Sequence, residues 1–456
     1  MSSRDESFDF IVDSANLSDM GDARELNDDL NEEDLDQVYS DELEPEEYGG
    51  NRDGFLADLA SSRPLYLIQR SHQQSAILPQ VFNDIAIAYS NEMSFGIVAP
   101  MPRMSPTTLR NFFQAHPAAQ IRIADPECFA RPDSLGPVLE AQREKAYVGQ
   151  STRRHWTYFD ATQPPGGTAQ WVQQVIDTQV NVGASVFLTP GVWADPAASR
   201  AGMNTMRQHA AWARGYLGAG TPLMVNVTLS WPWLTTERLR EQFLNEVLDM
   251  DEEVFYVRVR WPLLGQPYGQ LLDAGILDGY VEMANIFEEN DKSLILPNTG
   301  LTGAVALAWG AHGFSTGLGS GERSFADTRV IKIKQSRPRP APTRRILAAQ
   351  ILHTTDLTTS GLLDAVTGGQ RCACAFCNRL RARPVGQFDK ALAGAHYLRR
   401  VADFAAALAS GRGGRRATAR QLVRTANQFA TSASSSVALS GANDPKHLPL
   451  WLDRLR

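Results

Sequence analysis

The chain has 456 residues, with 44 Lys+Arg against 51 Asp+Glu and a formal net charge of −7. Its length indicates one large domain with appendages, or two or three domains. A hydrophobic fraction of 43% is enough to bury a sizeable core, which excludes a globally disordered chain.

The charge is distributed very unevenly along the chain. Residues 1–50 carry a net charge of −16, residues 51–320 carry −6, and residues 321–456 carry +15. The first segment is poor in aromatic residues, so we expect a disordered acidic tail over residues 1–53. This tail is either a solubilising segment or a polyanion mimic that folds back on the basic end. The overall acidity therefore does not exclude a polyanionic partner.

Features that direct a chain to a membrane or out of the cell are missing from the pattern. The first residues, MSSRDESFDF, contain no basic region followed by an apolar one, and no run of 18 apolar residues occurs. Three of the four cysteines lie within six residues, which favours a metal site over a disulfide framework. We expect a cytoplasmic protein with no membrane contact.

Short apolar, β-branched runs recur from about residue 60 and predict eight strands. These are residues 65–69, 95–99, 120–124, 184–188, 223–227, 255–259, 293–296 and 313–315. Helical periodicity lies between several of them, at 168–180, 203–216 and 236–248. Near-continuous apolar strands that alternate with helices predict a parallel sheet buried on both faces. An α/β fold with a (β/α)8 barrel over residues 54–330 fits eight such units, and a doubly wound open sheet is the alternative.

The character of the sequence changes after residue 320. A Gly-rich segment is followed by a basic, Pro-rich run and then by the cysteine cluster, and residues 388–410 predict an amphipathic helix. We expect a basic zinc-binding subdomain with a closing helix over residues 331–410. A basic helical extension is expected over residues 411–456.

The cysteine cluster is the most specific motif in the chain. Cys372, Cys374 and Cys377 form a C-x-C-x2-C turn, and His396 follows 19 residues after the last cysteine. Three thiolates from one loop and an imidazole from a helix make a common structural set for zinc. Four protein ligands leave no open position, so we expect a structural Zn²⁺. His353 is the alternative fourth ligand, and Cys128 is expected to be an ordinary buried cysteine.

With this motif placed after an eighth strand, the sequence resembles the tRNA-guanine transglycosylase family, or a divergent relative that acts on DNA. Looser similarity lies in residues 166–195, 199–218 and 292–314, so that the resemblance spans about residues 60–410. The resemblance implies a (β/α)8 barrel with a zinc subdomain inserted after the eighth strand. It also implies exchange of a guanine-type base, such as a 7-deazaguanine, in a nucleic acid.

The family's catalytic motifs are altered in this chain. Asp125 stands where the resemblance places the general base, but the two glycines that follow this aspartate in the family are missing. Ser315 stands where the family has its nucleophilic aspartate, and a serine without a nearby base cannot readily attack C1′. The strand that should lead into the base-reading loop ends near Asn226, which we take as a substrate-binding candidate.

Polar residues that follow the predicted strands are further candidates, because barrel active sites form at these ends. Asp125 and Asp195 would be the paired carboxylates of a base-exchange or glycosidic reaction, unless each merely caps a helix or lies in a loop. A Gly-rich segment after the last strand could bind a phosphate through its backbone, although such segments are mostly turns. Its residues are Gly317, Gly319, Gly321 and Arg323.

The C-terminal part is rich in arginine rather than lysine, which favours contacts with phosphates. Tryptophans near residues 231–233 and 261 either stack on a base or pack under loops. The first hypothesis is therefore an enzyme, a pentosyltransferase that exchanges or removes a guanine-type base in tRNA or DNA. The second is a catalytically inactive paralogue that binds nucleic acid or serves as a homodimer or partner subunit. An unrelated barrel enzyme acting on a small phosphorylated substrate ranks third.

Overall fold

The computed structural model describes most of the chain after residue 51. The described residues are 52–60, 63–70, 75–131, 155–159, 167–191, 193–262, 269–326, 344–366, 368–369, 371–383 and 387–456. The predicted acidic tail up to residue 51 and the basic, Pro-rich run within 327–343 lie outside these residues. The predicted boundary near residue 330 lies outside them as well.

Eight parallel strands form a nearly closed barrel, which confirms the predicted fold class. They are β1 (Leu65–Gln69), β2 (Ser94–Pro100), β3 (Ile121–Asp125), β4 (Phe187–Leu188), β6 (Leu223–Ser230), β7 (Val254–Arg260), β8 (Ser293–Leu296) and β9 (Gly313–Gly317). The order around the sheet is β3-β2-β1-β9-β8-β7-β6-β4, and a short extra strand, β5 (Trp193–Ala194), also pairs with β6. Near β4 the ring closes, because Ser185 N donates to Arg122 O at 2.9 Å. A doubly wound open sheet is thereby excluded.

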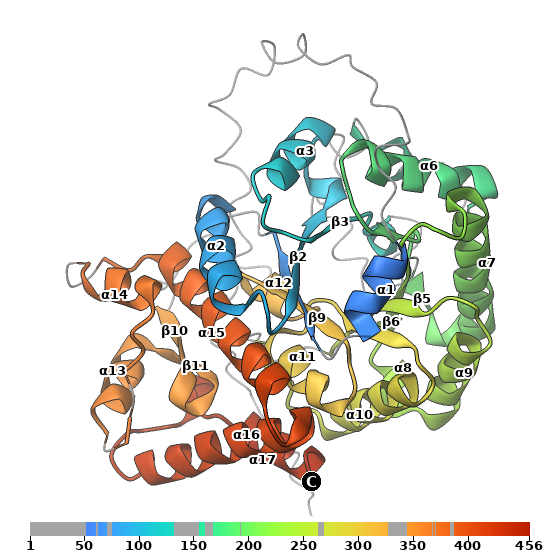
Figure 1. Ribbon diagram of the computed structural model, residues 1–456. Helices are drawn as coiled ribbons and strands as arrows, with labels where there is room; N and C mark the ends of the chain where they lie inside the picture. The colour runs from blue at the N-terminus through green and yellow to red at the C-terminus, as the bar shows by residue number, and fades with distance from the viewer. Residues whose placement is uncertain are drawn as a thin grey trace, which may run out of the picture.

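Helices cover the outside of the barrel (Figure 1). They are α2 (Leu78–Tyr89), α3 (Pro106–Gln114), α6 (Ala169–Asn181), α7 (Ser199–Leu217), α8 (Pro232–Thr235), α9 (Glu237–Leu248), α10 (Ala274–Glu289), α11 (Gly300–Ala306) and α12 (Ser320–Arg323). The three helices predicted from periodicity are confirmed as α6, α7 and α9. Helix α6 begins where predicted because Thr168 caps it, with its hydroxyl accepting from Trp171 N at 3.2 Å. None of the described helices is both long enough and apolar enough to cross a membrane.

Alternate strand residues point into the barrel and divide its interior into two halves. At the N-terminal end, Leu65, Val254 and Ile295 belong to one apolar cluster that also contains Phe55 and Leu59 of α1 (Arg52–Ala60). Helix α1 therefore closes this end with apolar side chains. The same alternation places polar side chains at the C-terminal end of the barrel, which is the end where barrel enzymes carry their active sites.

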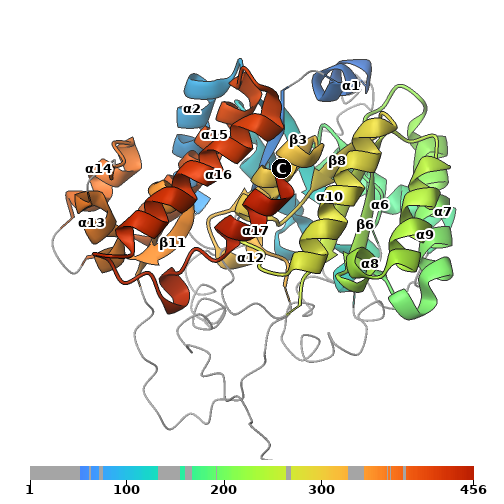
Figure 2. The same ribbon diagram turned by 90° about the horizontal axis from the view of Figure 1, so that it is seen from below.

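The C-terminal part forms a small hairpin and a group of helices on one side of the barrel (Figure 2). The hairpin is β10 (Arg345–Ala348) with β11 (His353–Asp356), and the helices are α13 (Leu357–Ala365), α14 (Ala375–Arg381), α15 (Lys390–Ser410), α16 (Gly414–Ala433) and α17 (His447–Arg454). Helix α15 packs against both α2 and α16. Its Leu398 carbonyl accepts a hydrogen bond from the Tyr66 hydroxyl of β1 at 3.1 Å. Helix α15 thus covers the barrel beside its first strand.

Candidate functional site

The predicted metal ligands converge in the structure. Cys372, Cys374, Cys377 and His396 each offer one ligand atom, and these atoms lie within 4.8 Å of one another. The His396 Nδ1 atom is 3.0 Å from the Cys377 sulfur, 3.4 Å from that of Cys374 and 3.8 Å from that of Cys372. This donor set of three thiolates and one imidazole could hold a metal ion such as zinc.

Local structure fixes the orientation of these ligands. Cys374 caps α14, with its sulfur accepting from the Cys377 backbone N at 3.4 Å, so the two sulfurs lie on the same side of the turn. His396 is buried in the second turn of α15, and its Nε2 atom donates to the Leu347 carbonyl of β10 at 2.8 Å. This bond leaves Nδ1 facing the three sulfurs. In metal sites, a hydrogen bond from the second ring nitrogen of a ligating histidine commonly orients the ring in this way. Burial lowers the pKa of His396, but hydrogen bonds to Cys372 and Cys374 outweigh burial and raise it to about 9.

The alternative fourth ligand, His353, lies elsewhere. Its Nε2 atom donates to the Ala442 carbonyl at 2.9 Å, and its ring centroid is 5.3 Å from that of His447. His396 therefore completes the cluster. Cys128 is buried in the main core cluster, in agreement with the expectation that it is an ordinary buried cysteine.

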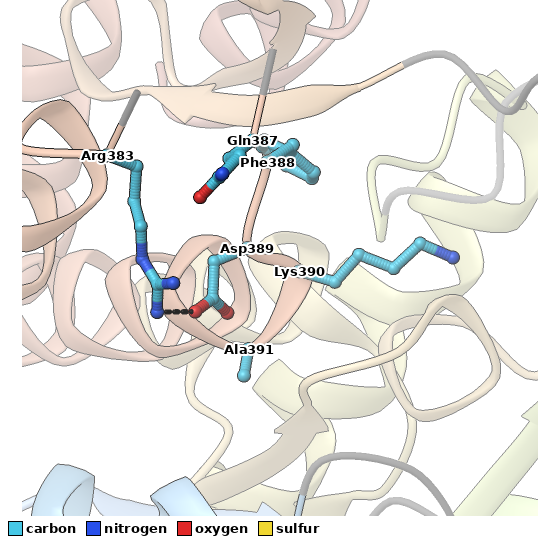
Figure 3. A pocket seen from close by; sticks show the side chains of 6 residues that line it. All are labelled: Arg383, Gln387, Phe388, Asp389, Lys390 and Ala391. Carbon is cyan, nitrogen blue, oxygen red and sulfur yellow. Dashed lines mark hydrogen bonds and ion pairs between the residues drawn. The ribbon is translucent and has the colours of Figure 1, made fainter. Parts of the chain in front are cut away.

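A surface pocket of about 330 Å³ lies next to the start of α15 (Figure 3). Its lining residues are Arg383, Gln387, Phe388, Asp389, Lys390 and Ala391. Arg383 forms an ion pair with Asp389 at 2.7 Å, and the Asp389 carboxylate also caps α15 by accepting from Leu392 N at 3.0 Å. Arg383 and Asp389 therefore already interact with other groups of the protein.

At the C-terminal end of the barrel, a buried ion pair joins two strands. Asp125 ends β3 and pairs with Arg258 of β7, and each side chain is only 1% exposed. The Asp125 carboxylate also accepts from Glu127 N at 3.0 Å, and the Arg258 guanidinium lies 4.5 Å from the ring centroid of Phe129. Burial opposes the charge of Arg258, but Asp125 raises its pKa above the ordinary value. Asp125 is thus held between a backbone N–H and a permanent cation.

A network of amides extends this pair across the mouth of the barrel. The side-chain oxygen of Asn298 accepts from Arg258 Nε at 3.2 Å and from Gln69 Nε2 at 3.1 Å. The Asn298 amide nitrogen donates back to Gln69 Oε1 at 2.6 Å. The Asn298 backbone N donates to the Ser315 hydroxyl at 2.8 Å, so Ser315 belongs to this polar network rather than to an apolar surround.

On β6, the strand next to β7, Asn226 has a different environment. Its side chain is 2% exposed, and neither its amide oxygen nor its amide nitrogen has a hydrogen-bond partner in the described part of the chain. The Thr228 hydroxyl group also lacks a partner among those residues. Buried polar groups are normally paired, so such a group of unpaired atoms at a barrel mouth is typical of a site for a polar ligand.

Asp195 does not join Asp125 as a second carboxylate. It is exposed, and its carboxylate accepts from Ala197 N at 2.9 Å, capping a short 3-10 helix over Pro196–Ala198. Asp125 instead has Arg258 as its partner. The local capping role, the simpler of the two alternatives from sequence, is therefore the one observed for Asp195.

In the Gly-rich segment at the end of β9, side chains of the same segment bind its backbone groups. Gly319 N donates to the Glu322 carboxylate at 2.8 Å, and a Cβ on Gly317 would lie 2.5 Å from the Cβ of Glu322. Arg323 donates to the Gly317 carbonyl at 3.2 Å and to the Leu318 carbonyl at 2.6 Å, and it lies 3.8 Å from the ring centroid of Tyr397. The carbonyl of Gly321 accepts from Asn298 at 3.2 Å. In this arrangement the groups expected to bind phosphate stabilise the loop.

The tryptophans after β6 and β7 divide between packing and exposure. Trp233 is buried and donates to the Ala194 carbonyl at 3.0 Å, and Trp261 is buried and donates to the Tyr280 hydroxyl at 2.9 Å. Trp231 is 39% exposed. Two of the three therefore pack in the protein, and only Trp231 is accessible to a base.

Sequence reasoning placed Arg258, Gln69 and Asn298 among the polar residues at the barrel mouth, but it assigned none of them a role. Their signal was present, because each is a polar residue at or just after a strand end. Arg258 and Arg260 also interrupt the otherwise apolar run VFYVRVR. The sequence could not show that Arg258 meets Asp125, since the two are 133 positions apart.

Comparisons with known proteins add no assignment. No family model matches the chain, and neither a curated protein nor a solved structure matches it. The function has to be inferred from the geometry of the site.

Proposed function

We propose that this protein is a transglycosylase-like nucleic-acid protein that binds a guanine-type base at the mouth of its barrel. The observation that carries the proposal is the buried polar layer there. The Asp125–Arg258 pair joins β3 to β7, and the amide of Asn226 on the neighbouring β6 has no partner in the described part of the chain. A guanine-type base offers donors and acceptors along one planar edge, which suits an amide and a carboxylate. The resemblance of the Cys3His module to the transglycosylase family supports the same assignment.

In the proposed exchange, Asp125 acts as the general base and Asn226 hydrogen-bonds the base edge. The C1′–N bond to the outgoing base breaks and a new C1′–N bond to the incoming base forms. The proton lost by the incoming base is taken up by the outgoing one, so that Asp125 ends the cycle unchanged. Arg258 holds the Asp125 carboxylate in place through their ion pair.

A specific observation favours a second candidate, a protein that binds without catalysing exchange. Ser315 replaces the family's nucleophile, and its hydroxyl accepts from Asn298 N rather than lying beside a carboxylate. Asp125 is already neutralised by Arg258. A base held by these groups would be bound, while no group would stabilise C1′ after cleavage.

We further propose that the Cys3His cluster holds a structural Zn²⁺. Four protein ligands would complete a tetrahedron, and His396 links the ion to α15. The metal would therefore stabilise the basic module beside the barrel. It would supply no water or substrate position.

The test is incubation of the full chain with labelled guanine or 7-deazaguanine and either bulk tRNA or duplex DNA. Exchange predicts incorporation into one nucleic acid. It also predicts loss of incorporation in Asp125→Asn under conditions in which this less stable variant is still folded and holds its zinc. Binding without chemistry predicts no incorporation but a free base that raises the melting temperature. Absence of both incorporation and base binding would reject both candidates.

Asn226→Leu is the matched variant for base recognition. It removes two polar atoms that have no partner among the described residues, without changing the side-chain volume much, so we expect the free energy of unfolding to stay constant or rise. Base binding should fall at least tenfold. A variant that binds the base as well as the wild type would exclude Asn226 from the site.

A further inference from the structure

Four arginines form a regular row at the C-terminal end of the protein. Arg412 lies two residues before α16, and Arg416, Arg420 and Arg424 lie on α16 at intervals of four. All four side chains are exposed. We call these four residues the arginine ridge. Each interval within α16 advances about 6 Å along the helix, so Arg416, Arg420 and Arg424 extend over about 12 Å, and Arg412 lies in the turn before them.

The opposite face of α16 fixes the direction in which the ridge points. Ala419, Val423 and Ala426 are buried in the main core cluster, and α16 packs against α15. Arg415 is turned inward, and its guanidinium donates to the Ala311 carbonyl at 3.5 Å. The helix therefore cannot rotate without losing its core contacts, and the ridge stays on the outer surface.

The charges of the ridge are not balanced within the described chain. Helix α16 contains no acidic residue, and none of the four arginines forms an ion pair with a described carboxylate. Several arginines elsewhere differ, since Arg399 pairs with Asp84 at 2.5 Å and Arg454 with Asp278 at 2.8 Å. Like charges four residues apart destabilise an isolated helix. The arrangement is thus unfavourable unless an anionic partner contacts the ridge.

The neighbouring residues define the chemistry of this partner. Gln421, Thr425 and Gln428 are exposed beside the ridge and add hydrogen-bonding groups. No large hydrophobic residue of α16 is among the exposed ones, which argues against insertion into a lipid surface or docking of an apolar protein face. Arginine, rather than lysine, favours bidentate contacts with phosphate oxygens.

We propose that the arginine ridge docks the phosphodiester backbone of a nucleic acid. The inference rests on the proposed function only for the class of partner, because α16 lies beyond the region that resembles the transglycosylase family. The ridge would read no bases. It would position the strand so that a base can reach the barrel mouth, as backbone contacts do in other nucleic-acid complexes.

The experiment measures binding of labelled duplex DNA and of bulk tRNA to the full chain over a range of salt concentrations. The variant is Arg416→Gln/Arg420→Gln. The matched control, Arg110→Gln/Arg207→Gln, removes two positive charges that the chain already uses. Arg110 donates to the Asn181 carbonyl at 3.1 Å, and Arg207 pairs with Glu246 at 2.5 Å.

We expect the ridge variant to bind about tenfold or more weakly at 0.1 M salt. The slope of log affinity against log salt should fall in magnitude by about 2, one for each lost phosphate contact. The control should retain the wild-type slope. Equal slopes for the two double variants would overturn the proposal.

Polyglutamate at equal charge concentration provides a second arm. Competition as strong as that of unlabelled DNA would identify a general polyanion site and overturn nucleic acid as the occupant. The assay contains no free base, so exchange cannot occur in it and its outcome is separate from that of the exchange assay. Ridge-dependent binding without exchange or base binding would reject the proposed function alone, and exchange with ridge-independent binding would reject the ridge alone.

Discussion

Asp125 and Arg258 meet inside the barrel from strands β3 and β7, which are not neighbours in the sheet, and each side chain is only 1% exposed. Removing two charges from water is costly, and the cost is offset only while both partners are present. This pair is consequently both a structural tie across the barrel and the centre of its polar mouth. Any variant at either position has to be judged for stability before it is judged for activity.

The first prediction concerns this pair. Asp125→Asn leaves Arg258 as an uncompensated buried cation, so we expect the free energy of unfolding to fall by about 3–5 kcal/mol. The double variant Asp125→Asn/Arg258→Met removes the stranded charge and should recover part of this loss. Urea unfolding of both variants provides the measurement. A double variant that is less stable than the single one would show that the pair does not carry this energy.

The second prediction concerns the Cys3His cluster. We expect one zinc per chain by elemental analysis, and a lower melting temperature after treatment with a chelator. Cys374→Ser should lower the zinc content and the melting temperature together. Cys128→Ser is the control, because Cys128 lies in the barrel core and should leave the zinc content unchanged. Full zinc occupancy in Cys374→Ser would contradict the assignment.

The third prediction concerns pH and two stacked histidines of the C-terminal part. Burial lowers the pKa of His353 to about 4 and that of His447 well below its ordinary value. Below pH 6.5 the unfolded chain binds protons at these positions while the folded chain does not, so stability falls as the pH falls from 6.5 toward 4. For each unit by which folding lowers the pKa of a histidine, the free energy of unfolding falls by about 1.4 kcal/mol over this pH range.

Urea unfolding between pH 7 and 4 tests this dependence in the wild type and in His353→Gln. The variant should lose less stability over this range, although it is less stable at pH 7. His155→Gln serves as the control, because His155 is exposed. Parallel pH profiles for wild type and His353→Gln would refute the role of this residue.

The fourth prediction uses two glycines with similar backbone angles. Gly191 has φ +73° and Gly183 has φ +83°. An alanine Cβ at Gly191 would lie 2.1 Å from the Asn226 amide nitrogen, whereas at Gly183 it would meet nothing within 4 Å. Gly183→Ala should cost about 1 kcal/mol from backbone strain alone.

Gly191→Ala should cost at least another ~1 kcal/mol, because Asn226 must move. It should also weaken base binding, since it displaces the unpaired amide. Equal stability and equal base binding in the two variants would show that Gly191 does not support Asn226. Thermal melts and the free-base binding assay together decide between these outcomes.

The sequence predicted the features that depend on local pattern. All eight barrel strands lie where apolar runs placed them, with shifts of a residue or so at most ends. The four residues of the Cys3His cluster were predicted correctly, because the cysteine motif is short and the histidine follows on one helix. The strand β5 and the hairpin of β10 and β11 were missed, since runs of two to four residues carry little periodicity.

The content of the barrel mouth could not be predicted in the same way. Asp125 was chosen correctly as a residue of the mouth, but its partner depends on which strands face each other across the ring. Asp195 carries the same functional group, yet a local backbone N–H satisfies it at the surface. Whether a polar side chain binds a ligand or its own loop is decided by tertiary contacts, which Arg323 also illustrates.

Helix α15 has a consequence for the order in which the chain assembles during synthesis. The Tyr66 hydroxyl of β1 can form its hydrogen bond only after the Leu398 carbonyl has been made, 332 positions later in the chain. Until α15 has left the ribosome, the outer face of the first strand has no permanent cover, although all eight strands have already been made. Since His396 lies two residues before Leu398, capture of a metal ion by the cysteine turn would also deliver this cover. The supply of metal could therefore set how long a nascent barrel remains exposed to aggregation and proteolysis.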